Sequence, residues 1–141
     1  MYRETHDGRY LDQANKTAAF LMSHPHLPTD KIPYWDYDAP TIPDAPRDAS
    51  AAAIMCSAFF ELSDFVDADT GRRYLALAEQ QLRSLSSSAY RAKPGENHGF
   101  LLMHSTGHLP AKSKIDVPIN YADYYFLEAL RCCKARLERK G

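Results

Sequence analysis

No run of about eighteen apolar residues occurs in this sequence, so we expect no membrane-spanning helix. The first residues, Met1 to Asp7, also lack the hydrophobic segment of a secretion signal, and the chain is predicted to be soluble. Neither sign of charge dominates, because 17 Lys and Arg balance 18 Asp and Glu to leave a net charge of -1. This balance argues against the basic surface that nucleic-acid binding requires.

Cysteine is scarce, with only Cys56, Cys132 and Cys133, and the count is odd. Because Cys132 and Cys133 are neighbours, a disulfide between them would be strained, and we expect no disulfide framework. Cys56 lies among apolar residues and is interpreted as a small core residue. What the chain does contain is apolar material, 45% of its 141 residues, which is enough for the core of one domain.

The first half of the chain is predicted to contain two helices joined by a long loop. Apolar residues at helical spacing predict a helix over residues 8–23, with Asp7 as its N-cap. Six of the nine prolines fall within Pro25–Pro46, which precludes a long helix or a central strand there. A second helix follows, with Asp48 as its N-cap and an Ala-rich apolar side that continues to Val66.

The second half repeats this arrangement. A third helix is predicted over Asp69–Ser86, beginning there or one residue later, and a fourth begins at Asn120 and continues to the end of the chain. Residues 87–119 between them are punctuated by glycine and proline and are predicted to be mostly loop. Within this loop, Phe100–Met103 is interpreted as a short buried strand or turn.

The first and third helices also match in sequence. The matched residues, 64 positions apart, are Arg9 and Arg73, Tyr10 and Tyr74, Leu11 and Leu75, Ala14 and Ala78, and Leu21 and Leu85. A helix, a long loop and a second helix, used twice, form the unit of an all-α toroid of helical hairpins. Two such hairpins leave open flanks, and the exposed apolar surface predicts self-association or a missing partner segment.

Aromatic and acidic residues concentrate in the segment Pro33–Ser50, which reads PYWDYDAPTIPDAPRDAS. Aromatic rings pack on sugar faces, and a helix N-terminus beside an arginine attracts a carboxylate. We therefore interpret Trp35, Arg47 and Asp48 as candidate sugar-binding residues. The structural alternative is that Trp35 and Tyr37 fix the loop to the helices while Asp48 only caps.

Asp36 and Asp38 could be imagined as the acid and base of a glycoside hydrolase. Their placement two residues apart on one loop argues against this role. Such neighbours are similarly solvated, whereas division of labour needs surroundings that separate the two pKa values.

A second polar group lies in the loop before the fourth helix. His104 and His108 have the spacing of a helical metal-binding pair, but Gly107 and Pro110 disfavour a helix, and no metal site is predicted. A nucleophilic Ser105 is disfavoured because the glycines of a nucleophile elbow are missing. We interpret His104, Ser105 and His108 instead as candidate polar residues of the sugar site.

Two blocks of the sequence resemble the unsaturated glucuronyl hydrolases, glycoside hydrolase family 88. The first is Pro33–Ser50, and the second runs from Leu101 to Arg131, with LLMHSTGHLP followed by DVPINYADYYFLEALR. With the helices between them, the resemblance covers nearly the whole chain. It implies that residues 1–141 are the C-terminal part of a single (α/α)6 barrel domain, an incomplete barrel of about four long helices.

The resemblance also implies a function. The family consists of bacterial enzymes that add water to the C4=C5 double bond of the terminal unsaturated uronic acid of lyase-released oligosaccharides, after which the glycosidic bond opens. No metal or organic cofactor is implied. The family's two catalytic aspartates lie in its N-terminal half, so no catalytic residue is predicted here and the isolated chain is expected to be inactive. The Ser-x-x-Ser-x-Lys pattern associated with sulfated substrates is replaced by His108, Ala111 and Ser113, which leaves the preferred sulfation open.

Three hypotheses follow. The chain is part of a glucuronyl hydrolase and inactive by itself, or it is a helical binding or assembly module derived from such an enzyme, or oligomers of it retain residual activity.

Overall fold

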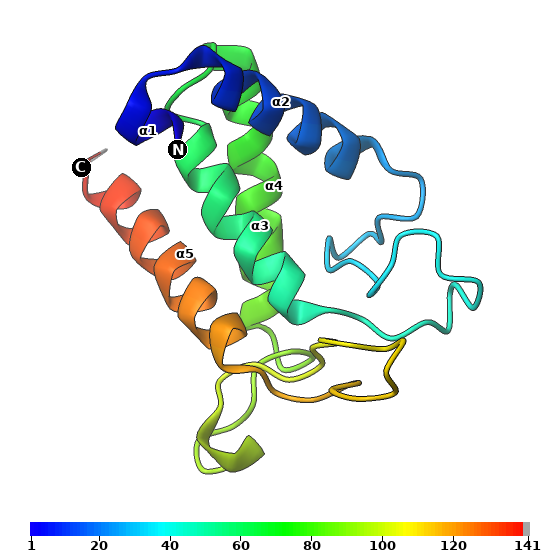
Figure 1. Ribbon diagram of the computed structural model, residues 1–141. Helices are drawn as coiled ribbons and strands as arrows, with labels where there is room; N and C mark the ends of the chain where they lie inside the picture. The colour runs from blue at the N-terminus through cyan, green and yellow to red at the C-terminus, as the bar shows by residue number, and fades with distance from the viewer. Residues whose placement is uncertain (140–141) are drawn as a thin grey trace.

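The computed structural model describes residues 1–139, and within them it is helical (Figure 1). The helices are α1 (Tyr2–Thr5), α2 (Gly8–Ser23), α3 (Ala49–Leu62), α4 (Ala68–Ser86), the 3-10 helix η1 (Asn97–Gly99) and α5 (Asn120–Glu138). In this part of the chain, β structure is limited to four isolated bridges. The predicted all-α class and the four long helices are confirmed; α1 is too short for the apolar periodicity to have predicted it.

Acidic N-caps determine where three of the helices begin. The carboxylates of Asp7 and Asp48 accept hydrogen bonds from the backbone N–H groups of Arg9 and Ser50, each at 3.0 Å, as predicted. For α4, however, the predicted start was one or two residues too late. Asp67 accepts from the backbone N–H groups of both Asp69 and Thr70 at 3.0 Å, and the hydrogen bond from Thr70 lowers the pKa of its carboxyl. The helix therefore begins at Ala68.

The predicted continuation of the second helix to Val66 was wrong, because α3 ends at Leu62. The Ser63 hydroxyl donates to the Phe60 carbonyl at 2.8 Å, and the chain then turns. The same carbonyl accepts a hydrogen bond from the Arg136 guanidinium of α5 at 2.6 Å. Because the Phe60 carbonyl accepts these two hydrogen bonds, it does not need the backbone N–H of a further helical turn as its partner.

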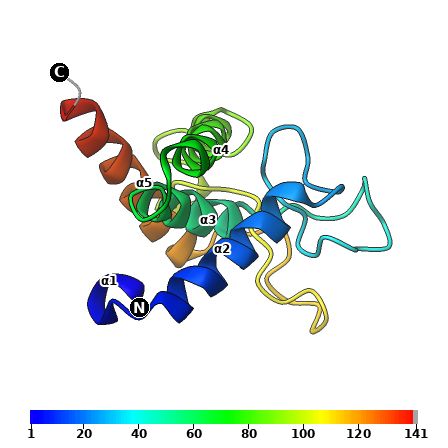
Figure 2. The same ribbon diagram turned by 90° about the horizontal axis from the view of Figure 1, so that it is seen from above.

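α3 is the central helix of the structure and packs against both α4 and α5 (Figures 1 and 2). Its buried residues are mostly small, which lets the neighbouring backbones approach closely. Cys56 is one of them and has no exposed surface; its thiol donates to the Ala78 carbonyl of α4, and burial raises its pKa. The interpretation of Cys56 as a core residue is confirmed.

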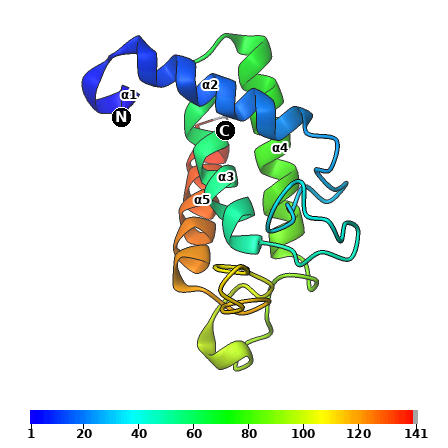
Figure 3. The same ribbon diagram turned by 45° about the vertical axis from the view of Figure 1, so that its right-hand side comes forward.

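Both long loops lie at one end of the helices (Figure 3). Residues 24–48 lead into α3, and residues 87–119 lead into α5, so the N-terminal ends of these two helices face the loops. The connection from α3 to α4 at the other end is short. Among residues 1–139, no helix combines the length and the apolar character that crossing a bilayer requires.

Replacing Arg136 with methionine is expected to destabilise the fold by about 2 kcal/mol, because a charged donor to a half-buried carbonyl is lost. Arg136 Nη2 also donates to the Ser63 hydroxyl at 2.8 Å and lies 2.6 Å from an oxygen of Asp64, so it joins α5 to the end of α3. Urea denaturation would measure the change. Lys134→Met is the matched control: Lys134 is exposed and its nitrogen lies 3.8 Å from Glu138, so a change within about 0.5 kcal/mol is expected. Equal losses of unfolding free energy in the two variants would contradict a stabilising role of the Arg136 hydrogen bonds.

Candidate functional site

The two loops meet where α3 begins, and we call this region the mouth. The backbone N–H of Ala49 donates to the His104 carbonyl at 3.0 Å. The Thr106 hydroxyl donates to the Arg47 carbonyl at 3.1 Å. Four of the six predicted site residues, at positions 47, 48, 104 and 105, are thereby brought together from segments more than fifty residues apart.

Asp48 has a structural role at the centre of the mouth. Its Oδ1 accepts from the Ser50 N–H at 3.0 Å and from the Ser50 hydroxyl at 2.6 Å. The same oxygen accepts from the backbone N–H of Thr106 at 3.3 Å. One carboxylate therefore caps α3 and holds the second loop against it.

The Arg47 guanidinium is held by two residues of the first loop. Its Nη2 forms an ion pair with Asp30, and its Cζ lies 4.9 Å from the centre of the Tyr34 ring, a cation–π arrangement. The side chain is 25% exposed. Its Nε is buried and has no hydrogen-bond partner among residues 1–139. The guanidinium is thus held in one orientation but remains within reach of a ligand.

Asp30 and Tyr90 were not found by reasoning from the sequence. The Tyr90 hydroxyl donates to Asp30 Oδ2 at 2.8 Å, and the Ser84 hydroxyl donates to the Asp30 carbonyl at 2.6 Å. Burial, and secondarily the hydrogen bond to Asp30, raises the pKa of Tyr90 to about 12. Asp30 therefore connects Arg47 to the C-terminal end of α4. Sixty residues separate Asp30 from Tyr90, and neither lies in a recognisable motif.

His104 extends this polar cluster through the second loop. Its Nδ1 lies 2.6 Å from Asp116 Oδ1, and its ring meets the Tyr90 ring edge-on at 6.1 Å. With a φ of 62°, its backbone is in the left-handed region, so the His104 to His108 segment is not helical. The spacing of these histidines therefore does not place them on one face of a helix. His108 is exposed on a tight turn, where it pairs with Ser113.

Ser105 is completely buried. Its backbone N–H and carbonyl pair with those of Val117 at 3.1 and 3.0 Å, and its hydroxyl has no partner within residues 1–139. The backbone at Gly107 lies close to the Ile119 side chain: a Cβ atom added to Gly107 would be 3.2 Å from it. The predicted short buried strand or turn at Phe100–Met103 is only partly correct: Leu102 is buried and forms an isolated bridge with Arg91, but Leu101 is exposed and no strand forms there.

The aromatic residues of the first loop hold it in place. Trp35 packs on a small apolar cluster formed by Tyr34, Ala39 and Ala45 of the same loop. The Tyr37 ring lies 4.7 Å from that of His24, and burial raises the pKa of Tyr37 to about 12. Tyr37 thus contacts the end of α2, as in the structural alternative, whereas Trp35 packs within its own loop.

Asp36 and Asp38 share one turn of the same loop. Asp36 Oδ1 accepts from the backbone N–H of Asp38 at 2.9 Å, and Asp38 lies near the His24 and His26 rings.

Helical hairpins whose long loops gather at one mouth define the class of α/α barrel proteins. No family model matches the chain. Over 130 residues, 92% of this chain, it is 52% identical to an unsaturated glucuronyl hydrolase from Formosa agariphila, of which it covers 32%. Over 139 residues, 94% of this chain, it is 33% identical to an unsaturated glucuronyl hydrolase from Bacillus sp. strain GL1, of which it covers 36%.

A solved structure is also similar to the chain in three dimensions. The crystal structure of an unsaturated glucuronyl hydrolase specific for heparin matches with a TM-score of 0.92 and 48% identity, over 98% of this chain and 36% of that one. The predicted relationship is confirmed: the chain is a relative of the unsaturated glucuronyl hydrolases. It spans about a third of the length of the curated relatives it matches, in agreement with the predicted C-terminal portion.

The free energy of unfolding is expected to decrease as the pH rises from about 10 to about 12. The decrease should be smaller in the Tyr90→Phe variant, which lacks the hydroxyl. The folded state raises the pKa of Tyr90 to about 12 from an ordinary value of 10.0, so in this window the unfolded chain releases the proton first. Urea midpoints across the window would measure the slope. Tyr121→Phe, at an exposed position, is expected to keep the original slope. Identical slopes for Tyr90→Phe and the unaltered protein would contradict the conclusion that folding raises the pKa of Tyr90.

Proposed function

We propose that this chain is the part of an unsaturated glucuronyl hydrolase that forms one side of the sugar pocket. In the complete enzyme, an acid protonates the C4=C5 double bond of a terminal unsaturated uronic acid, and water adds to the resulting cation. The product is a hemiketal, whose collapse opens the glycosidic bond. The observation that carries the proposal is the partly exposed Arg47 guanidinium, held at the mouth by Asp30 and Tyr34.

Arg47 is the proposed partner of the uronic acid carboxylate. A guanidinium binds a carboxylate with directed, charge-assisted hydrogen bonds, and a fixed orientation lowers the entropy lost on binding. His104 and His108, both with accessible side chains, are proposed to line the pocket further along the second loop. Trp35 is half-buried and is proposed as an aromatic contact of the sugar from the first loop.

Asp48 and Ser105 are proposed to support the pocket rather than contact the sugar. The hydrogen bonds of Asp48 hold both loops, and Ser105 is buried under the second one. Removing either side chain would move Arg47 or His104 indirectly, through the backbone contacts between the loops.

We assign no proton donor to this chain. The carboxylates nearest the mouth already bind protein groups: Asp30 pairs with Arg47, Asp48 caps α3, and Asp116 lies against His104. Asp123 accepts from two backbone N–H groups of the second loop at 2.8 and 2.9 Å. An acid that protonates carbon must instead face the substrate. The proposal therefore requires catalytic groups from the part of the enzyme that this chain does not span.

For the substrate, we propose an unsaturated disaccharide of the heparin type. The support is the heparin specificity of the solved relative that is 48% identical. The second loop carries His108, Ala111 and Ser113 at the positions associated with sulfate preference, so the position of any sulfate group stays open.

A chimeric enzyme tests the proposal. This chain would replace the matching region of the Formosa agariphila enzyme, to which it is 52% identical. The chimera is expected to remove the ultraviolet absorbance of the C4=C5 bond in unsaturated heparin disaccharides, whereas the isolated chain is not. A chimera with the circular dichroism and thermal unfolding of a folded enzyme, but without activity, would overturn the proposal. Activity of the isolated chain would contradict the absence of a proton donor from it.

In an active chimera, Arg47→Met is expected to raise KM about tenfold or more with a smaller change in kcat, because a charged hydrogen bond to the substrate is lost. Steady-state kinetics with the same disaccharide would measure both constants below the unfolding temperature of the variant. Arg73→Met is the control, since Arg73 is exposed near the N-terminal end of α4, the end opposite to the mouth. An unchanged KM in Arg47→Met would remove Arg47 from the site.

The alternative function is a helical binding or assembly module. It is favoured by the apolar residues that α5 exposes, including Tyr124 at 62% and Leu127 at 54%. Light scattering discriminates the two functions. A defined oligomer of the isolated chain, together with an inactive chimera, would favour the module.

A further inference from the structure

His104 and Asp116 form a side-chain pair within the second loop. His104 Nδ1 lies 2.6 Å from Asp116 Oδ1, and the two side chains are 43% and 61% exposed. A pair with this much exposure contributes little to the free energy of unfolding. What the contact determines is which nitrogen of the imidazole ring is engaged and which is left for another partner.

The backbone of the second loop holds His104 and Asp116 in place. Their next residues along the chain, Ser105 and Val117, exchange backbone hydrogen bonds at 3.1 and 3.0 Å. The His104 carbonyl is fixed as well, since it accepts from the backbone N–H of Ala49. With φ angles of 62° and 54°, both residues are left-handed, a conformation that His and Asp tolerate better than most non-glycine residues. The pair is therefore set by the loop backbone and is not a chance contact of two flexible side chains.

The end of α4 restricts the His104 ring from another side. The Tyr90 ring meets it edge-on, with the two centroids 6.1 Å apart. The Tyr90 carbonyl also accepts from the backbone N–H of Met103 at 2.8 Å, which holds the neighbouring backbone. Within residues 1–139, Nδ1 is the one nitrogen of the His104 ring that has a hydrogen-bond partner. Nε2 is therefore the polar atom that this partly exposed ring offers to a ligand.

The chemistry of a carboxylate determines where the ring proton of His104 lies. A carboxylate oxygen accepts hydrogen bonds and donates none, so Nδ1 must carry a proton to bind Asp116. In the neutral ring, Nε2 then holds a lone pair and can only accept. A histidine without such a partner exchanges between its two tautomers, and its Nε2 both donates and accepts. Asp116 thus determines the hydrogen-bonding polarity of the accessible nitrogen.

We propose that Asp116 is a positioning residue that fixes the neutral His104 ring as a hydrogen-bond acceptor for a hydroxyl group of the sugar. The identity of the ligand rests on the proposed function, whereas the tautomer rests on the contact with Asp116. Arg47 complements His104, because a guanidinium only donates and this ring nitrogen only accepts. A uronic acid offers both the carboxylate and the hydroxyls that such a pair requires. A ligand with an acceptor in place of that hydroxyl leaves Nε2 unpaired and is disfavoured.

The tautomer can be measured in the isolated chain, by NMR that correlates the ring nitrogens with the ring C–H protons. The spectrum is recorded at about pH 8, above the ordinary histidine pKa of about 6.5. Two other histidines provide reference patterns. His26 carries its proton on Nδ1, which lies 2.6 Å from the Tyr37 carbonyl; His24 carries it on Nε2, because its Nδ1 accepts from the His26 N–H at 3.3 Å. His104, identified by the loss of its signals in His104→Asn, is expected to show the His26 pattern.

Asp116→Asn is expected to give His104 a mixture of tautomers and to leave His26 unchanged, because an amide can either accept from Nδ1 or donate to it. Asparagine tolerates left-handed backbone, so the loop should be retained. In an active chimera, the substitution should raise KM at least about threefold with a smaller change in kcat, as one weakened hydrogen bond predicts. The increase should disappear when His104→Asn is already present, since Asp116 acts through His104. Asp12→Asn, at an exposed position of α2, is the matched control and should change neither the tautomer nor KM.

Three results would overturn the proposal: a proton on Nε2 of neutral His104 in the unaltered chain, a tautomer or a KM that Asp116→Asn leaves unchanged, or an equal rise in KM with and without His104→Asn. The last would make Asp116 a structural residue of the loop. An inactive chimera, together with the expected tautomer in the isolated chain, would refute the proposed function and with it the sugar as the ligand. It would not refute the positioning of His104 by Asp116.

Discussion

The carboxylate of Asp48 is the interaction on which the mouth depends. It accepts from the backbone N–H of Ser50 in the first turn of α3 and also from that of Thr106, which is 58 residues away in sequence. Because helix start, first loop and second loop share one acceptor, they cannot move independently. The position of Arg47 follows, since its backbone lies directly before the cap and its carbonyl accepts from Thr106.

Fixing the backbone does not by itself fix a long side chain. Arg47 would lose considerable rotamer freedom on binding a sugar unless its orientation were already restricted. Asp30 and the Tyr34 ring impose this restriction before any ligand arrives, and Tyr90 holds Asp30 in turn. The cost is a buried Nε without a partner among the described residues. This fixed orientation is what the proposed role of Arg47 as a carboxylate-binding group requires.

The sequence predicted what depends on local chemistry and missed what depends on distant partners. Asp7 and Asp48 could be recognised as caps because an N-cap acts within three residues. The end of α3 could not be placed, because Arg136 reaches its last carbonyls from α5, 76 residues away. Asp30 and Tyr90 belong to the candidate site for the same reason: only the folded chain brings them to Arg47. The candidate residues Arg47, Asp48 and His104 could thus be named from their motifs, while the contacts that hold them could not.

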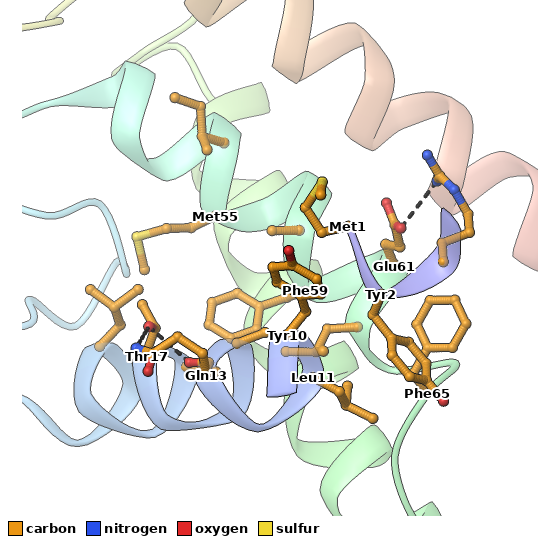
Figure 4. A pocket seen from close by; sticks show the side chains of 17 residues that line it. Met1, Tyr2, Tyr10, Leu11, Gln13, Thr17, Met55, Phe59, Glu61 and Phe65 are labelled. Carbon is orange, nitrogen blue, oxygen red and sulfur yellow. Dashed lines mark hydrogen bonds and ion pairs between the residues drawn. The ribbon is translucent and has the colours of Figure 1, made fainter. Parts of the chain in front are cut away.

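Tyr10 and Tyr74 show the same distinction at the level of the whole fold. They occupy matching positions in two helices of similar sequence, yet one is buried and the other half exposed. The apolar pattern of a helix specifies a face that can be buried, and the neighbouring element decides whether it is. On α4 that neighbour is α3, joined by a short turn. On α2 the same face borders a hollow lined also by α3 (Figure 4), so Tyr10 keeps part of its surface exposed.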